Sequence, residues 1–175
     1  GIKSANTDQL KALGAAMAAT GSVALYHIEG ITPEANDYDV KNLERLQLEE
    51  KDLQDIKESF SGEEVDAVMI GCPHASINEI REVSEIVKNK KLRKPLWIFT
   101  SRFTKELSYD LGYGKMIEES GGKIVSDTCM VVSPIESMGF KVIGVNSGKA
   151  ANYLPTLCKC RVVFGSIREL VEMIS

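Results

Sequence analysis

Apolar and polar positions along the chain follow a helical period in some segments and a strand period in others. Helical spacing covers residues 7–19, 49–60 and 76–90, one or two helices broken near Gly112 are expected over 101–121, and further helices over 146–155 and 166–175. Short apolar runs between turn residues predict strands at 22–28, 44–48, 65–71, 94–100, 123–127, 141–145 and 160–165. Asn6 or Thr7 is the expected cap of the first helix.

The order of these elements predicts the fold class. Strands and helices alternate, and the continuous apolar run of residues 65–71 fits a parallel strand that is buried on both faces. We therefore expect an α/β fold, a three-layer domain with a mainly parallel sheet flanked by helices and right-handed crossovers. Ligands of such sheets bind beyond the carboxyl ends of the strands. The loops expected there are residues 71–76, 99–104, 126–131 and 145–151.

Length and charge restrict the number of domains and the kinds of partner. The 175 residues, 43% of them apolar, suit one sizeable core, so we expect a single domain over residues 1–175. The net charge is −4 and basic residues are not interleaved with aromatic ones, so nucleic acid is not an expected partner. The basic run Lys88–Lys94 falls where a helix should end, where it is expected to stay solvated.

Cellular location follows from apolar length and cysteine usage. No apolar segment approaches the roughly 20 residues that cross a bilayer, and the first residues lack the order of a signal peptide, so no membrane contact is expected. The four cysteines form no paired framework and are interpreted as free thiols of a cytoplasmic protein.

Two cysteines lie in the expected strand-end loops. Cys72, in "GCPHAS", precedes a helix whose dipole would stabilise a thiolate, as a metal ligand requires, although a small residue in a tight turn explains it equally. Cys129, in "SDTCMVVSP", is surrounded by hydrogen-bonding side chains. The two are far apart in sequence and can meet only through the fold, as cluster ligands commonly do. Cys158 and Cys160 are interpreted as buried structural residues.

The remaining candidate residues could bind an anion or transfer a proton. Ser147 and Lys149, in "NSGKAA", could hold a carboxylate or phosphate at a helix start, although an ordinary capped helix explains the same residues and the Walker A spacing is absent. Arg102 could clamp an anion or lie on the surface. His27, near Glu29, could transfer a proton or be a half-buried structural histidine, and His74 is a neighbour of Cys72 whose role stays open.

Five motifs in order carry a resemblance to a known family. They are "GSVALYHIEGITPEA", "IGCPHAS", "SDTCMVVSPIESMGF", "NSGKAANYLP" and "VVFGSIREL", and they span nearly the whole chain. Together they resemble the large subunit of the aconitase X family. The resemblance implies a hydro-lyase of the aconitase superfamily that dehydrates a small hydroxy acid, with an iron–sulfur cluster or iron as Lewis acid and a small swivelling subunit as partner.

The resemblance also gives expectations for substrate and site. Family members dehydrate mevalonate 5-phosphate, our first expectation here, or cis-3-hydroxy-L-proline. By matching motif, Cys72 and Cys129 are the expected metal ligands. Arg102, Ser147 and Lys149 stay the substrate-binding candidates, and His27 and His74 the catalytic candidates, on the residue-level grounds given above.

The chain also departs from the family pattern. It looks about half as long as a family large subunit, so we expect a fragment with an incomplete ligand set that is inactive alone. The alternative of another class is a non-enzymatic α/β domain that binds a small anionic metabolite, with inert cysteines that lie far apart.

Overall fold

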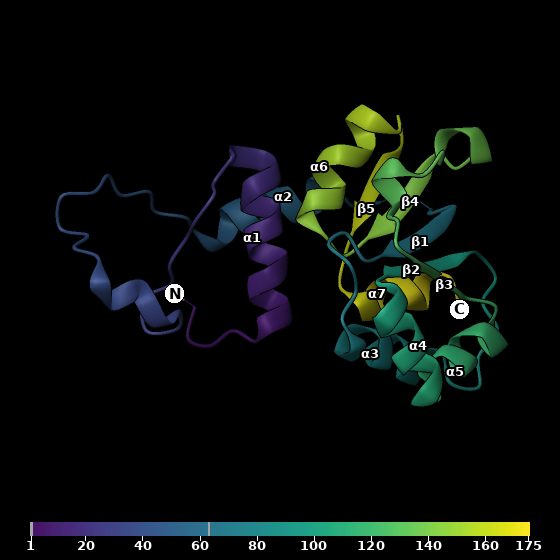
Figure 1. The fold of residues 1–175 in the computed structure, drawn as a ribbon. Helices are drawn as coiled ribbons and strands as arrows, with labels where there is room; N and C mark the ends of the chain where they lie inside the picture. The colour runs from purple at the N-terminus through teal and green to yellow at the C-terminus, as the bar shows by residue number, and fades with distance from the viewer. Residues whose placement is uncertain (1, 63) are drawn as a thin grey trace.

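A five-stranded parallel sheet forms the centre of the computed structural model, which describes residues 2–62 and 64–175 (Figure 1). The strand order is β3-β2-β1-β4-β5 and every neighbouring pair runs parallel. The strands are β1 (Ala67–Ile70), β2 (Leu96–Thr100), β3 (Lys123–Ser126), β4 (Val142–Val145) and β5 (Arg161–Phe164). The predicted α/β fold with a parallel sheet is confirmed.

Helices connect and cover the strands. They are α1 (Thr7–Gly21), α2 (Glu50–Ser59), α3 (Ile77–Val87), α4 (Arg102–Asp110), α5 (Tyr113–Ser120), α6 (Gly148–Leu157) and α7 (Ile167–Met173), with short 3₁₀ helices at Pro33–Asp37, Met130–Val132 and Glu136–Met138. Asn6 caps α1 by accepting a hydrogen bond from the Gln9 backbone. Gly112, in a left-handed conformation at φ 83°, separates α4 from α5 as predicted.

Two apolar cores lie on opposite faces of the sheet. Val68, Ile70 and Ile98 point to one face and pack with apolar side chains of α3, α5 and α7. Met69 and Phe99 point to the other, where α6 and the 129–138 loop cover them. This alternation of neighbouring residues between faces is what a buried parallel strand requires, and it gives the predicted three layers.

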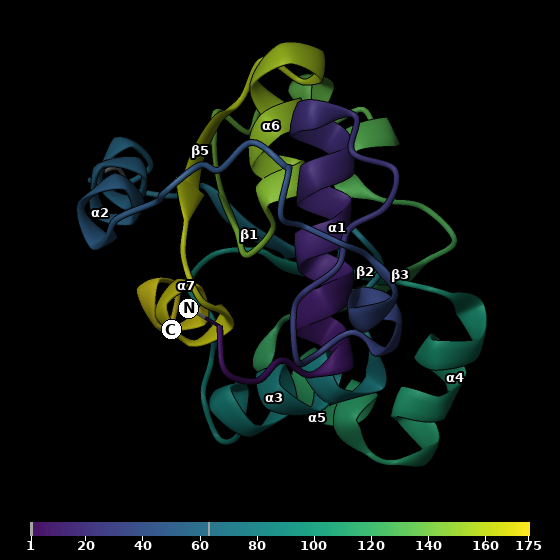
Figure 2. The same ribbon diagram turned by 90° about the vertical axis from the view of Figure 1, so that its left-hand side faces the viewer.

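The chain before the sheet packs on the outside of this arrangement. Helix α1 lies along α6, so it stands one layer farther from the strands (Figure 2). None of the described residues 2–62 is fully buried, and both cores are built from Val65 onward. Helix α1 therefore attaches to the sheet domain mainly through α6, while Phe60 packs against the second core beside β5.

Two predicted strands, 22–28 and 44–48, are wrong. Residues 22–28 form an extended segment along α1, where the Tyr26 hydroxyl donates to the carbonyl of Leu10 over 2.7 Å and its ring contacts Gly14. Residues 44–48 are irregular, and Leu46 is 87% exposed. An alternating pattern needs a neighbouring strand to become a sheet, and these segments lie beside a helix or face solvent.

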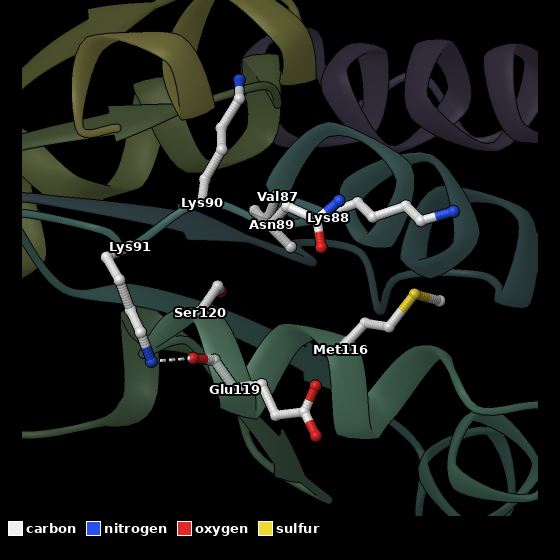
Figure 3. A pocket seen from close by; sticks show the side chains of 8 residues that line it. All are labelled: Val87, Lys88, Asn89, Lys90, Lys91, Met116, Glu119 and Ser120. Carbon is white, nitrogen blue, oxygen red and sulfur yellow. Dashed lines mark hydrogen bonds between the residues drawn. The ribbon is translucent and has the colours of Figure 1, made fainter.

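The basic run Lys88–Lys94 connects α3 to β2. Helix α3 ends at Val87, and the exposed residues 88–91 form a turn above α5, with a pocket of about 550 Å³ between them (Figure 3). Lys91 Nζ donates to the carbonyl of Glu119 over 2.6 Å, while Lys88 and Lys90 extend away from the pocket. Lys88, Lys90 and Lys91 are exposed at a helix end, as the sequence predicts, whereas Lys94 is partly buried and pairs with Glu64. Within the described residues, no helix has the length and apolar character needed to span a membrane.

Candidate functional site

The strand order defines where the loops at the carboxyl edge converge. The chain passes from β1 to β2 and β3 on one side and later returns to β4 on the other. The loops after β1 and β4 therefore flank a topological switch point, the usual ligand position of an open parallel sheet. Residues 71–76 and 146–147 occupy those loops, and the first turn of α6 follows the second of them.

Gly71 allows the loop after β1 to turn tightly against β2. Its φ is +109°, and a Cβ atom there would stand 2.0 Å from the carbonyl oxygen of Phe99. The same carbonyl accepts a 2.9 Å hydrogen bond from the Ala75 backbone, and the buried Thr100 hydroxyl donates to the Ala75 carbonyl over 2.6 Å. The loop is thus fixed to β2 at both ends of "GCPHA", with a cis peptide bond between Cys72 and Pro73.

The structure brings Cys72 and Cys129 together. Cys72 is 4% exposed, and the partly exposed Cys129 lies close enough to it to influence its pKa. Burial and the neighbouring Cys129 raise the pKa of Cys72 to about 11, while the positive charge of Lys149 acts in the opposite direction. Two thiols and a lysine from the loops after β1, β3 and β4 therefore share one site.

The Cys129 loop is held by its neighbours at both sides. Asp127 accepts hydrogen bonds from the Arg102 backbone over 2.9 Å and from Arg102 Nε over 3.0 Å. These bonds, together with the positive charge of Arg102, hold the pKa of Asp127 below its usual range. The Nε2 atom of exposed His74 lies 3.0 Å from the carbonyl oxygen of Thr128. Arg102 and His74, both candidates from the sequence, thus contact the loop that presents Cys129.

Ser147 joins the α6 helix to the loop after β1. Its buried hydroxyl accepts a 3.1 Å hydrogen bond from the Ala150 backbone as the α6 N-cap and donates to the carbonyl oxygen of Cys72. Lys149 follows in the first turn of the same helix. The substrate-binding candidates Ser147 and Lys149 therefore adjoin the thiol pair, with the serine already hydrogen-bonded on both sides.

His27 belongs to the segment that follows α1. Its ring stacks on Tyr38 with 4.4 Å between the centroids. Both ring nitrogens are buried and have no hydrogen-bond partner among the described residues. The catalytic candidate His27 thus stacks on a residue of the same N-terminal part of the chain.

Cys158 and Cys160 are buried in the second core, as interpreted from the sequence. Their thiols donate to the carbonyls of Val131 and Phe140 over 3.6 and 3.4 Å, and burial raises the pKa of each. Over residues 2–62 and 64–175, no three or more Cys, His, Asp or Glu side chains gather as a metal site. This chain therefore offers a pair of thiols at the carboxyl edge.

Sequence reasoning missed two polar contacts at the site. Asp127 is one of the hydrogen-bonding side chains near Cys129 in the sequence, and its position directly after a strand and the tolerance of Asp for positive φ (here 59°) point to a turn. Lys11 of α1 reaches the Glu79 carboxylate over 2.5 Å and the His74 carbonyl over 3.0 Å. The sequence signal for this contact is the charge of Lys11 on the inner face of a helix.

Known proteins resemble the chain over its full length. The model of the aconitase X third domain matches residues 65–175, and that of the aconitase X second domain matches residues 1–58. A phosphomevalonate dehydratase large subunit from Methanocaldococcus jannaschii is 48% identical over 95% of this chain and 42% of its own length. A cis-3-hydroxy-L-proline dehydratase from Hypocrea jecorina is 30% identical over 94% and 30%.

A solved structure gives the same result in three dimensions. The crystal structure of Thermococcus kodakaraensis aconitase X in its holo form superposes with a TM-score of 0.93 at 41% sequence identity. The superposition covers 100% of this chain and 46% of that one. The chain thus spans less than half the length of the relatives it matches.

Proposed function

Because the chain belongs to the aconitase X family, we propose that it forms part of an iron-dependent hydro-lyase that removes water from a small hydroxy acid. The single observation that carries this proposal is the proximity of Cys72 and Cys129 at the carboxyl edge of the sheet. Thiolates are the ligands that iron–sulfur clusters use in proteins. The proposed metal ligands are these two cysteines.

The donor set fits such a group in part. Two adjacent thiols can fill two positions of an iron or iron–sulfur site, and the proposed further ligands come from another part of the complete enzyme. Metal binding requires the thiolate form, so the high pKa of Cys72 means that loading would release protons. When bound, iron would supply a Lewis acid for the departing hydroxyl group.

Lys149 is the proposed principal anion-binding residue. It lies in the first turn of α6, close enough to Cys72 to lower the pKa of that thiol. A cation at a helix N-terminus attracts a carboxylate or phosphate, which both candidate substrates carry in some form. Ser147 and Arg102 stay candidates, and the bonds they make to Cys72 and Asp127 support a role in shaping the site.

His74 is the proposed proton-transfer residue. If its Nε2 carries the proton that is donated to the Thr128 carbonyl, then Nδ1 of the neutral ring is left as a base. The exposed ring stands beside the thiol-bearing loops, where a substrate would lie. His27 is a second candidate, supported by its unpartnered ring nitrogens.

Mevalonate 5-phosphate is the proposed substrate, because the phosphomevalonate dehydratase subunits are more similar to this chain than the cis-3-hydroxy-L-proline dehydratase. The relatives' description as large subunits supports a small subunit as partner. The free cysteines support a cytoplasmic location. We also propose that residues 1–175 act as one unit, since Lys11 ties α1 to the loop after β1.

The test uses the two-subunit enzyme that the proposal implies, with Cys72→Ala, Cys129→Ala and the control Cys160→Ala. We expect both site variants to lose the visible absorption of the cluster after anaerobic reconstitution and to lose dehydration of mevalonate 5-phosphate. The control, whose thiol is buried away from the pair, should keep both. Retention of cluster and activity in Cys72→Ala would overturn the ligand assignment, and turnover of cis-3-hydroxy-L-proline alone would overturn the substrate.

The non-enzymatic alternative makes a different prediction. It requires inert cysteines that lie far apart, and the proximity of Cys129 to Cys72 weighs against it. A domain that only binds an anion would bind phosphate equally well with or without Cys72. We expect no stable cluster on residues 1–175 alone, and a stable cluster with turnover there would contradict the incomplete ligand set.

A further inference from the structure

We infer that Asp127 is a positioning residue, which sets the direction of the Cys129 thiol toward Cys72. The inference rests on the proposed function in one respect only, namely that the thiol pair serves as metal ligands. Its basis is the position of Asp127, two residues before Cys129, and the set of bonds that its carboxylate and backbone make.

Three bonds fix the carboxylate of Asp127 in place. One oxygen accepts from the backbone N–H of Arg102, the first residue of α4, over 2.9 Å. The other oxygen accepts from Arg102 Nε over 3.0 Å and lies 2.8 Å from Arg102 Nη2. A carboxylate at a helix N-terminus with a two-point guanidinium contact has one favourable orientation. The side chain is therefore held against a rigid helix.

The backbone of Asp127 transmits this orientation to Cys129. Its N–H donates to the Thr100 carbonyl over 2.9 Å, which continues the pairing of β3 with β2 by one residue. Its φ of 59° then turns the chain away from the sheet. The next carbonyl, that of Thr128, lies 3.0 Å from the His74 ring. Cys129 thus leaves a turn that is anchored to α4 and to the loop after β1.

The pairing of the thiols depends on both loops being held. Cys72 is held from the side of α6 by Ser147, and Cys129 is only partly buried, so packing alone constrains it less. Loss of the Asp127 carboxylate would release the turn from α4 and widen the range of positions that the Cys129 thiol samples. The cost falls on the two-thiol geometry while the sheet stays folded, because Asp127 itself belongs to neither apolar core.

Phenylarsine oxide provides a test that needs no iron, because its arsenic forms bonds to two nearby thiols and its oxygen leaves as water with the two thiol protons. The experiment uses residues 1–175, reduced and metal-free, with Cys158→Ala and Cys160→Ala in every variant so that only the site pair reacts. Asp127→Ala, Asp127→Asn and the control Glu64→Ala are compared. Glu64 also forms an ion pair, with Lys94 near the start of β1, and its side chain is exposed.

We expect the parent and Glu64→Ala to bind one equivalent, and Asp127→Ala to bind about tenfold more weakly because the second thiol is no longer held at high effective concentration. Asp127→Asn should stay within about threefold of the parent, since asparagine tolerates positive φ and keeps an oxygen for the Arg102 N–H. Circular dichroism and urea unfolding verify that each variant is folded.

Equal binding by folded Asp127→Ala and the parent would overturn the inference, as would a parent that fails to bind one equivalent. If Asp127→Ala does not fold, Arg102→Met removes the guanidinium contacts and leaves the backbone bond, with an expected loss of about threefold; no loss would count against the inference. If the parent binds the arsenical but the reconstituted two-subunit enzyme takes up no cluster, the proposed function is refuted and the positioning role stands.

Discussion

The hydroxyl group of Ser147 donates a hydrogen bond to the carbonyl oxygen of Cys72 while accepting one from the backbone of Ala150. One buried side chain thus serves as the N-cap of α6 and as the link between the loops on the two sides of the switch point. Because β1 and β4 are neighbours in the sheet, this link crosses the place where a ligand would enter.

Ser147→Ala is expected to lower the free energy of unfolding by about 1–3 kcal/mol, because it removes a helix cap and leaves the buried Cys72 carbonyl without its donor. Ser147→Thr keeps the hydroxyl and is the matched control, with a smaller loss. Equilibrium unfolding in urea measures both. Equal stability of Ser147→Ala and the parent protein would show that neither bond contributes.

Gly71→Ala should prevent the loop after β1 from approaching β2. The added Cβ atom would overlap the Phe99 carbonyl, and the residue would also be strained at φ +109°. Gly121→Ala is a close control, since its φ is +102° and nothing lies within 4 Å of the added atom. We expect about 1 kcal/mol of destabilisation at Gly121 and about 3 kcal/mol or more at Gly71, measured by urea unfolding. Similar losses at both positions would mean that the loop relaxes without cost.

Alkylation should distinguish the four thiols of the metal-free chain. Cys129 is partly exposed, whereas the other three are buried, and the pKa of Cys72 is about 11. Because only the thiolate reacts, iodoacetamide at pH 8 should modify Cys129 first, and the rate at Cys72 should rise up to about pH 11. Peptide mass spectrometry identifies the order. Modification of Cys158 or Cys160 before Cys129 would contradict the burial of the second core.

The strands of the sheet could be predicted from sequence because their apolar runs are bounded by turn residues, and β1 and β4 at the centre are buried throughout. Residues 22–28 show the same composition and form no strand, since Tyr26 packs on α1. Whether an apolar run finds a neighbouring strand or a helix depends on tertiary contacts, which a local pattern does not contain.

The site could be predicted at the level of loops and cysteines. The rule that ligands bind beyond the carboxyl ends of parallel strands selects the segments that hold Cys72, Cys129 and Lys149. The pairing of Arg102 with Asp127 could not be predicted, because 25 positions separate them and each follows a different strand. Charged residues pair according to the register of β2 and β3, which only the folded chain defines.

Asp66 should make stability depend on pH at the acidic end. Its carboxylate accepts hydrogen bonds from the backbones of Val142 and Lys141 over 2.9 and 2.8 Å, and these bonds hold its pKa below the usual range. A lowered pKa in the folded state means that the stabilisation is complete above the unfolded pKa of about 3.9 and is lost as the pH falls through the folded value.

Asp66→Ala should therefore be less stable than the parent protein at pH 7, by about 1 kcal/mol because the side chain is exposed and solvent screens its bonds. This difference should shrink as the pH falls below about 4, since the parent then loses the same charge. Asp66→Asn keeps one acceptor without titrating, so its loss at pH 7 should be smaller and its stability should vary less with pH. Urea unfolding at pH 7, 5, 4 and 3 measures these differences, and a constant gap between Asp66→Ala and the parent would rule out the titration of Asp66 as their cause.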